Sequence, residues 1–258
     1  MLVQNSKQLL KKTVFCTHKK LYNIIEHSKS SKKGRIKMDS NRKTAIIVGV
    51  LFIIATVATL LSGLFFGSIY DSDYLTAVSA NENQVLIAVL FMLTASASIV
   101  GIPIALFPIL KKHNESLALG YVGARIFEAL FFVVSAIGLL AILSLSQEFV
   151  NATTPVASYF ETSGALLLGV FDWSGILLDI PFALSAVMLN YVYYSSKLIP
   201  RWLSGWGFIG GALMLVGGVV GMFGVTEAIY LAALIGIQEM VLAGWLIIKG
   251  FNSSVISS

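Results

Sequence analysis

Five charged residues lie inside long apolar runs of this 258-residue chain. Arg125 and Glu128 fall in one run, Asp172 and Asp179 in a later run, and Glu239 in the last. Charged side chains in the apolar helices of membrane proteins usually face the interior or a wet cavity and pair with one another. Carboxylates beside a guanidinium in such a place can bind a cation or relay a proton, and this is the chemistry that the residue types indicate.

The spacing of these residues places them on shared helix faces. Arg125 and Glu128 are three positions apart, so they lie on one face of a helix and can pair there. Asp172 and Asp179 are seven positions apart, which is two turns along one face, with Asp172 nearer the outer side. We therefore predict one intramembrane polar cluster, formed by Arg125, Glu128, Asp172, Asp179, Gln238 and Glu239.

The predicted cluster has an excess of negative charge. Its four carboxylates and single guanidinium would carry a net charge of −3 if all were ionised. Uncompensated charge is costly away from water, so either some acids carry protons at neutral pH or a cation neutralises them. The pair Arg125–Glu128 alone fits a structural role as well as a functional one. An ion pair that only stabilises the fold does not require more acids than bases, so the surplus of acids in the whole cluster favours a functional role.

Six apolar runs are long enough to hold these residues in a membrane. A helix of about 20 apolar residues crosses ~30 Å of hydrocarbon, and backbone groups in lipid must be satisfied within the helix. Only 12% of the residues are charged, against about 25% in soluble domains. We therefore predict an all-α polytopic membrane protein, a bundle of six transmembrane helices over 44–66, 85–110, 117–145, 164–194, 202–223 and 228–248.

Basic residues indicate the orientation of the predicted spans. They lie in the connections 111–112 and 197–201, and Lys249 follows the last run, whereas the three other connections contain no Lys or Arg. Positively charged loops stay in the cytoplasm, so we predict that both termini are cytoplasmic. The membrane domain 44–249 would then be followed by a short cytoplasmic tail, 250–258, and we expect the protein in the plasma membrane of a prokaryote.

Residues 1–43 form a basic extension before the first run. They contain 12 of the 18 Lys and Arg residues and the single cysteine, Cys16. They lack the apolar core of about 7–15 residues that a secretory signal needs. Three interpretations remain open: a solvated cytoplasmic extension, an arm that binds anionic lipid, or, for residues 1–37, upstream sequence included by an early start codon. Met38 would then be the natural start.

Several classes of function are disfavoured. The apolar runs contain no histidine, so they hold neither a bis-histidine haem nor a His-Glu-x-x-His zinc site, and there is no glycine-rich phosphate loop. No nucleic-acid motif follows the basic segment. Asp172 and Asp179 lie on one helix, whereas the paired aspartates of aspartyl hydrolysis face each other across the substrate. We predict no cofactor, no metal and no nucleic-acid partner, and a non-enzyme rather than an enzyme.

The fifth apolar run is rich in glycine. Gly207 and Gly211 are four positions apart, as are Gly217 and Gly221, and this spacing lets helix backbones approach closely. The pairs predict helix packing within the chain. The same pattern also fits a homo-oligomer interface or space for a ligand.

Four short motifs occur in order along the chain. They are RKTA at 42–45, GARIFE at 123–128, LIPRWLSGWG at 198–207, and QEM followed by WLIIKGF within 238–251. Together they resemble the bacterial membrane family labelled domain of unknown function 4386, from about Ser40 to Phe251. The resemblance implies a six-span bundle and no assigned activity, and it leaves out residues 1–37.

Two hypotheses about function follow. In the first, the cluster binds or conducts a proton, a cation or a small polar molecule within the lipid bilayer. In the second, the protein is a non-catalytic structural or regulatory membrane subunit that packs through its glycine-rich helix. A water-accessible cavity that reaches the acids would favour the first hypothesis, and a dry, tightly packed ion-pair core would favour the second.

Overall fold

The computed structural model describes residues 40–152, 157–224 and 229–256, and all regular secondary structure in these residues is helical. The predicted basic extension lies almost entirely outside the described residues, as does Cys16. In chain order the helices are the N-terminal helix Ser40–Phe65, η1 Gly67–Tyr70, α2 Tyr74–Ala80, α3 Glu82–Leu110, α4 Glu115–Asn151, α5 Ala157–Ser196, α6 Arg201–Gly221, α7 Ile229–Ile248 and α8 Ser253–Ile256.

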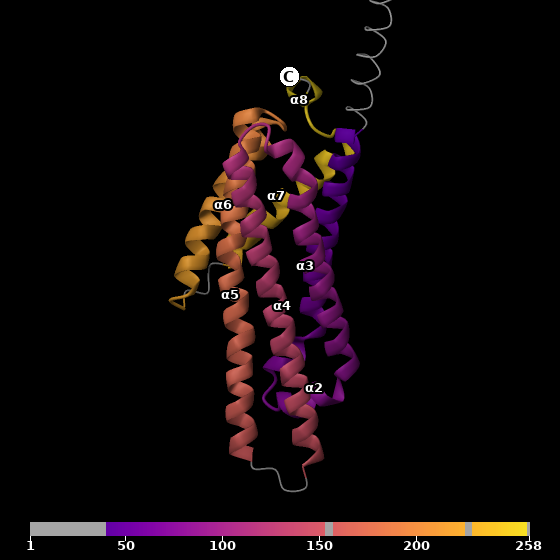
Figure 1. Cartoon of the computed structure of the whole chain (residues 1–258). Coiled ribbons are helices and arrows are strands. Elements are labelled where there is room, and N and C mark those ends of the chain that lie inside the picture. Colours follow the sequence, from indigo (N-terminus) through magenta and orange to yellow (C-terminus); the bar gives the residue numbers. More distant parts are fainter. Residues whose placement is uncertain (1–39, 153–156, 225–228, 257–258) are drawn as a thin grey trace, which may run out of the picture.

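Five of these helices are long and apolar enough to cross a membrane: the N-terminal helix, α3, α4, α5 and α6. In α7 the stretch Ala233–Ile248 is also apolar, but it is shorter. The long helices form one bundle, in which the N-terminal helix begins and α8 ends at the same end (Figure 1). The described part of the chain is therefore all-helical, and its apolar helices indicate a membrane protein.

Helices α4 and α5 extend beyond the apolar runs 117–145 and 164–194. They have 37 and 40 residues, or about 55 and 60 Å at ~1.5 Å per residue, which exceeds the ~30 Å thickness of the hydrocarbon. Helix α4 continues through Gln147 and Glu148 because both residue types are good helix formers. The two helices pack as a hairpin that projects past the other helices at the end opposite to α8 (Figure 1).

The connection between the first two long helices is itself partly helical. It contains η1 and α2, and α2 packs against α4. Leu75 and Val78 of α2 and Ile69 of η1 are buried. The short helix α2 is stable here because the bundle covers its apolar residues. The polar composition of this connection does not predict such a helix.

Helix ends at the opposite side of the bundle have clear caps. The Asn114 side chain accepts a hydrogen bond from the backbone N–H of Leu117 at 2.9 Å, which caps the N-terminus of α4. Lys197 follows α5 with a left-handed φ of 59°, and Gly250 follows α7 with a φ of 73°, a conformation in which helices commonly end. The chain thus reverses direction sharply near its basic residues.

Arg42 joins the N-terminal helix to α7. Its guanidinium donates hydrogen bonds to the carbonyl oxygens of Leu246, Ile247 and Ile248, at 2.9 Å for the first and 3.2 Å for the last. The final carbonyls of a helix lack partners within it and form the negative end of its dipole. A Cβ atom at Gly49 would lie 2.7 Å from Ile247, so glycine there allows the two helices to approach.

The apolar core is divided into two large clusters along the bundle. Along the N-terminal helix, the cluster nearer the start of the helix ends at Phe52, and the second cluster begins at Ala55. Along α4, the change falls between Tyr121 and Ala129. The charged residues that the sequence singled out on α4 lie in this interval, so apolar layers enclose them on both sides.

Candidate functional site

Arg125 is buried between the two apolar clusters and is ion-paired to Glu128 on the same helix. Its Nη1 lies 3.1 Å from both carboxylate oxygens of Glu128. The exposed fractions of the two residues are 2% and 3%. The spacing of three positions on α4 brings the side chains together, and their burial makes this pair a dry one.

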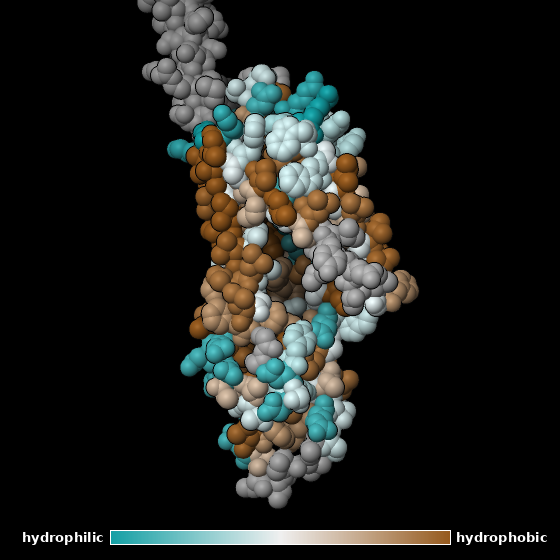
Figure 2. Space-filling view, turned by 180° about the vertical axis from the view of Figure 1, so that it is seen from behind, coloured by the Kyte–Doolittle hydropathy of each residue, from teal (hydrophilic) through white to brown (hydrophobic). Residues whose placement is uncertain are grey.

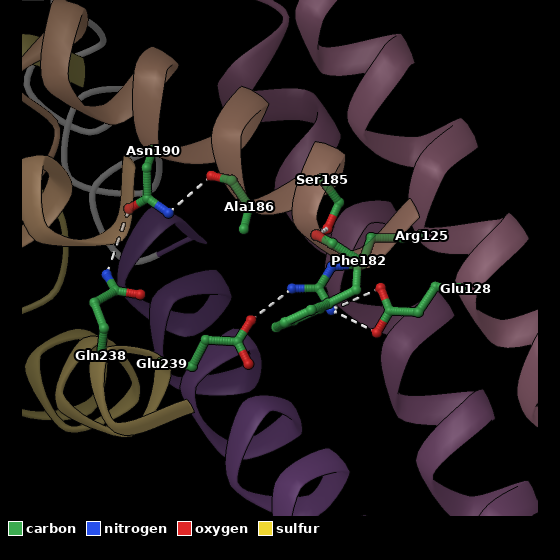
Figure 3. A network of polar contacts seen from close by, with 8 residues as sticks. All are labelled: Arg125, Glu128, Phe182, Ser185, Ala186, Asn190, Gln238 and Glu239. Atoms are coloured by element: carbon green, nitrogen blue, oxygen red, sulfur yellow. Dashed lines mark hydrogen bonds and ion pairs between the residues drawn. The ribbon is translucent and has the colours of Figure 1, made fainter. Parts of the chain in front are cut away.

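A second carboxylate reaches Arg125 from another helix. The Nη2 of Arg125 donates to Oε1 of Glu239 on α7 at 2.8 Å (Figure 3). The Glu239 side chain is 13% exposed, against 3% and 4% for Arg125 and Glu128, so Glu239 is the more accessible of the two acids. We call these three residues the ion-paired group; with both acids ionised, its net charge is −1.

Aromatic rings complete the surroundings of the guanidinium. The Cζ atom of Arg125 lies 5.6 Å from the ring centre of Phe52, 5.7 Å from that of Tyr121 and 5.5 Å from that of Phe182. A cation over an aromatic face is attracted by the ring. Arg125 therefore contacts side chains of the N-terminal helix, α4, α5 and α7. Tyr121 lies one turn before Arg125 on the same helix, so the spacing in the sequence could have predicted this contact. Phe52 and Phe182 are on other helices, and no spacing in the sequence predicts their contacts with Arg125.

Asp179 lies near the ion-paired group without being bonded to it. It is partly buried on α5, three positions before Phe182, whose ring contacts Arg125, and it packs against Gly218 of α6. Among the described residues it has neither a hydrogen bond nor an ion pair. In the same residues no group of three or more His, Cys, Asp or Glu could hold a metal ion.

Asp172 lies apart from the ion-paired group. It is exposed and accepts a hydrogen bond from the hydroxyl of Tyr70 in η1 at 2.8 Å. Partial desolvation and this hydrogen bond raise the pKa of Tyr70 above its usual value, so its hydroxyl remains a donor. Asp172 is on the same face of α5 as Asp179, but α6 ends at Gly221, shortly after passing Asp179, and does not cover it.

Gln238 belongs to a different polar contact from that of its neighbour Glu239. It is fully buried, and its Nε2 donates to Oδ1 of Asn190 at 3.4 Å and to the carbonyl of Leu203 at 3.2 Å. Asn190 in turn donates to the carbonyl of Ala186 at 2.9 Å. Consecutive residues of α7 thus bond in different directions. Gln238 joins α7 to α5 through Asn190 (Figure 3) and to α6 through the carbonyl of Leu203.

The glycines of α6 lie at several different surfaces. A Cβ atom at Gly207 would overlap the Asn190 side chain, and one at Gly211 would lie 3.1 Å from Ala186 Cβ, so both glycines face α5. Gly217 is also buried. A Cβ atom at Gly221 would meet nothing within 4 Å. The first pair is therefore in contact within the chain, whereas Gly221 is open.

One face of the molecule is hollowed at mid-height, and hydrophilic atoms lie deep inside the hollow (Figure 2). The charged residues between the two apolar clusters are those of the ion-paired group together with Asp179. Glu239 and Asp179 are the partly exposed members of this set.

Comparison with curated proteins found no match, and comparison with solved structures found none either. A family model does match the chain, over residues 47–250. This range includes all of the ion-paired group, Asp179 and the glycine-rich helix. It contains the motifs at 123–128 and 198–207 and all but the last residue of the motif within 238–251, whereas the motif at 42–45 lies before it. The chain therefore belongs to the family described as Domain of unknown function (DUF4386).

Proposed function

We propose that this protein is a six-span membrane protein whose ion-paired group and Asp179 form an intramembrane site for a proton, a cation or a small polar molecule. The observation that carries the proposal is the excess of acid. One guanidinium faces Glu128 and Glu239 directly, and Asp179 adds a further carboxylate. A purely structural pair needs one acid for one base, whereas this site has a surplus that a proton or cation would neutralise.

The accessibility of the acids supports the same proposal. Glu239 and Asp179 are partly exposed, and the hollow in Figure 2 has hydrophilic atoms at its floor. A ligand would therefore meet these two acids before the buried Arg125–Glu128 pair. Glu128 would hold the guanidinium in place, and Glu239 would be the acid that exchanges between Arg125 and the ligand.

The proposed orientation places both termini in the cytoplasm. Arg42 binds the end of α7, and the backbone N–H of Asn252 donates to the carbonyl of Leu198 at 2.9 Å, so the basic connections share one end of the bundle. With 20 residues, α7 reaches about 30 Å, enough for a sixth span. In a Cys16→Ser background, an impermeant maleimide should label Asp71→Cys on intact cells and Lys112→Cys only after permeabilisation; the reverse pattern would contradict the orientation.

A second candidate function is a structural or regulatory membrane subunit. The burial of Arg125 and Glu128, with exposed fractions of 2% and 3%, favours it, since Glu128 fixes the guanidinium in a dry place from which it joins α4 to Glu239 of α7. This function predicts that no added cation changes stability through Glu239 or Asp179 and that no ion crosses the membrane; pH alone does not separate the two functions, because any ion-paired carboxylate makes stability depend on pH. The two candidates therefore differ in a measurable quantity.

The test is a screen of the purified full chain for ligand-dependent thermal stability and for flux in proteoliposomes, over pH and inorganic cations. Glu239→Gln and Asp179→Asn should each weaken the response by about tenfold or more, because a lost contact to a charged group is worth about 1.5–3 kcal/mol. The matched control is Glu148→Gln, which removes an exposed carboxylate from α4. A response that is equal in all three variants would reject the proposed site.

A further inference from the structure

Helix α7 touches the N-terminal helix near the start of that helix and then diverges from it. A Cβ atom at Gly49 would lie 2.7 Å from Ile247 and 2.8 Å from the carbonyl oxygen of Ala243. Farther along, the second apolar cluster includes the N-terminal helix from Ala55 onward, but in the described part of the chain it includes nothing of α7. There α7 packs through Ile235 against α5 and α6 instead. The two helices therefore separate toward the middle of the bundle (Figure 1).

The two helix faces that meet at Gly49 become uncovered beyond this contact. Thr56 and Gly63 follow Gly49 at intervals of seven positions, so the three lie on one face of the N-terminal helix. Thr56 is partly exposed, and a Cβ atom at Gly63 would meet nothing within 4 Å among the described residues. On α7, Gly236 is seven positions before Ala243 and is equally open. We call the space between these two faces the side opening.

Glu239 lies where the side opening begins. It is three positions after Gly236 and four before Ala243, so it shares their face of α7. Its Oε2 makes no hydrogen bond within the described ranges, and neither does the buried Nε of Arg125, so protein atoms alone do not satisfy the ion-paired group. The hollow with hydrophilic atoms inside lies at mid-height on one side of the molecule and not at an end (Figure 2).

The surroundings of the side opening are apolar and lie at the depth of the hydrocarbon. Ile53 and Val57, beside Thr56 on the N-terminal helix, are exposed, as is Ile237 of α7. Glu239 is ten positions before Lys249, or about 15 Å along the helix, which is half of the ~30 Å hydrocarbon thickness. A ligand that enters here therefore passes apolar side chains first and then meets more acids than bases.

We propose that the site binds an amphipathic organic cation, which enters from the bilayer through the side opening. The inference rests on the proposed function and names the class of its ligand. The cationic head bonds to Oε2 of Glu239 in the polar hollow, where its charge offsets the surplus of acid. The apolar chain lies between the N-terminal helix and α7, among side chains of the same character. An inorganic cation has no such chain, and the acids repel an organic anion.

The experiment is equilibrium binding of isotope-labelled n-octylammonium to the full chain in lipid nanodiscs, with the uptake by empty nanodiscs subtracted. n-Octylammonium should bind at least about a hundredfold more tightly than methylammonium, because burial of each methylene group is favourable. n-Octyl sulfate has the same chain and the opposite charge, and it should show no saturable binding. Glu239→Gln should weaken the binding of n-octylammonium by about tenfold or more, because it removes the charged acceptor.

Two variants fill the side opening, one from each helix. Gly236→Leu and Thr56→Phe should each weaken the binding of n-octylammonium by about tenfold or more, because the new side chain occupies the place of the ligand chain. Gly244→Leu is the matched control. A Cβ atom at Gly244 also meets nothing within 4 Å in the described residues, but this position is about 100° around the helix from Ala243. Its affinity should equal that of the wild type.

Unfolding temperatures of all variants, measured in parallel, separate loss of the ligand from loss of the fold. A filling variant that keeps its unfolding temperature and loses affinity supports the inference, and either of the two is sufficient. If both lower the unfolding temperature, the comparison of the two ammonium ions decides, and equal affinities would reject the inference.

Wild-type affinity for n-octylammonium in both filling variants, or in Glu239→Gln, would overturn the inference. Absence of n-octylammonium binding by the wild type would also overturn it. In each of these cases, a response to an inorganic cation that depends on Glu239 would leave the proposed site standing. The proposed site fails as well if no cation, organic or inorganic, gives a response that depends on Glu239.

Discussion

The Arg125 guanidinium contacts two carboxylates and three aromatic rings in a part of the molecule where its exposed fraction is 2%. Taking charges out of water costs several kcal/mol for each ion, and good geometry must recover that cost. Here Nη1 and Nη2 are bonded, and Nε has no partner among the described residues. Replacing the guanidinium would leave Glu128 and Glu239 facing each other without a counter-charge.

The Arg125→Met variant should therefore lose about 3–5 kcal/mol of unfolding free energy, as expected when one partner of a buried ion pair is removed. Equilibrium unfolding in detergent measures the loss. Adding Glu239→Gln to this variant should recover part of it, because one unpaired charge is then removed as well.

The control for this prediction is Arg201→Met. Arg201 is exposed, and its guanidinium lies 5.2 Å from the ring centre of Tyr194, a contact worth about 0.5–1 kcal/mol at an exposed site. A loss in Arg125→Met no greater than that in Arg201→Met would contradict the view that Arg125 neutralises buried acids.

The spacing of the charged residues in the sequence predicted some of their contacts and not others. The Arg125–Glu128 pair follows from a spacing within one helix, and Glu239 was grouped with them because buried charges seek partners. Asp172 is bonded to Tyr70 instead, because the neighbouring helix ends before it reaches that level. Helical periodicity gives the face on which a residue lies, but where an adjacent helix stops is a property of the tertiary structure.

At the scale of helices, α6 determines how closely α5 and α7 can approach the site. Gly207 lies against Asn190, whose amide donates to the carbonyl of Ala186 and accepts from Gln238 of α7. Glycine at this position leaves room for a buried amide network that joins three helices. The close approach of α6 to α5 therefore depends on a missing side chain as much as on apolar contacts.

The Gly207→Ala variant tests this packing. Its new methyl group would displace the Asn190 amide, and the broken hydrogen bonds should cost about 1–3 kcal/mol, partly offset by ~1 kcal/mol from the better helix propensity of alanine. The unfolding temperature should therefore fall.

Gly205→Ala is the matched control, two positions away on the same helix. A Cβ atom there would meet only Tyr194 at 3.9 Å, so the variant should be unchanged or stabilised by up to about 1 kcal/mol. If Gly207→Ala were equally well tolerated, Asn190 would not be held in the manner described.

The sequence predicts helix positions better than helix lengths. Each long helix covers an apolar run, because apolar runs of about 20 residues form helices in lipid. The apolar runs 117–145 and 164–194 are longer than one crossing needs, so tilted, kinked or protruding helices follow from the sequence. How far α4 and α5 continue past these runs was not predicted, since a run of apolar residues shows where lipid ends and not where the helix ends. The spacing of Gly207 and Gly211 predicted close packing, but the partner helix was visible only in the structure.

At the scale of the whole molecule, a charged layer separates two apolar clusters. On the N-terminal helix this layer falls between Phe52 and Ala55, and on α4 it contains Arg125 and Glu128. Apolar layers on both sides increase the strength of every charge interaction inside. The proposed function requires that water nevertheless reach Glu239 and Asp179 through the hollow in Figure 2.

The most direct test of this requirement is thiol modification of Asp179→Cys in a Cys16→Ser background, with small water-soluble methanethiosulfonate reagents of opposite charge. The account predicts modification by both reagents, with the cationic one faster by about tenfold or more because the remaining acids concentrate cations in the cavity. Ile237→Cys, on an outward-facing position of α7 that is 57% exposed, should react with neither in liposomes. No reaction at Asp179→Cys, or a faster reaction with the anionic reagent, would contradict a water-accessible acidic site.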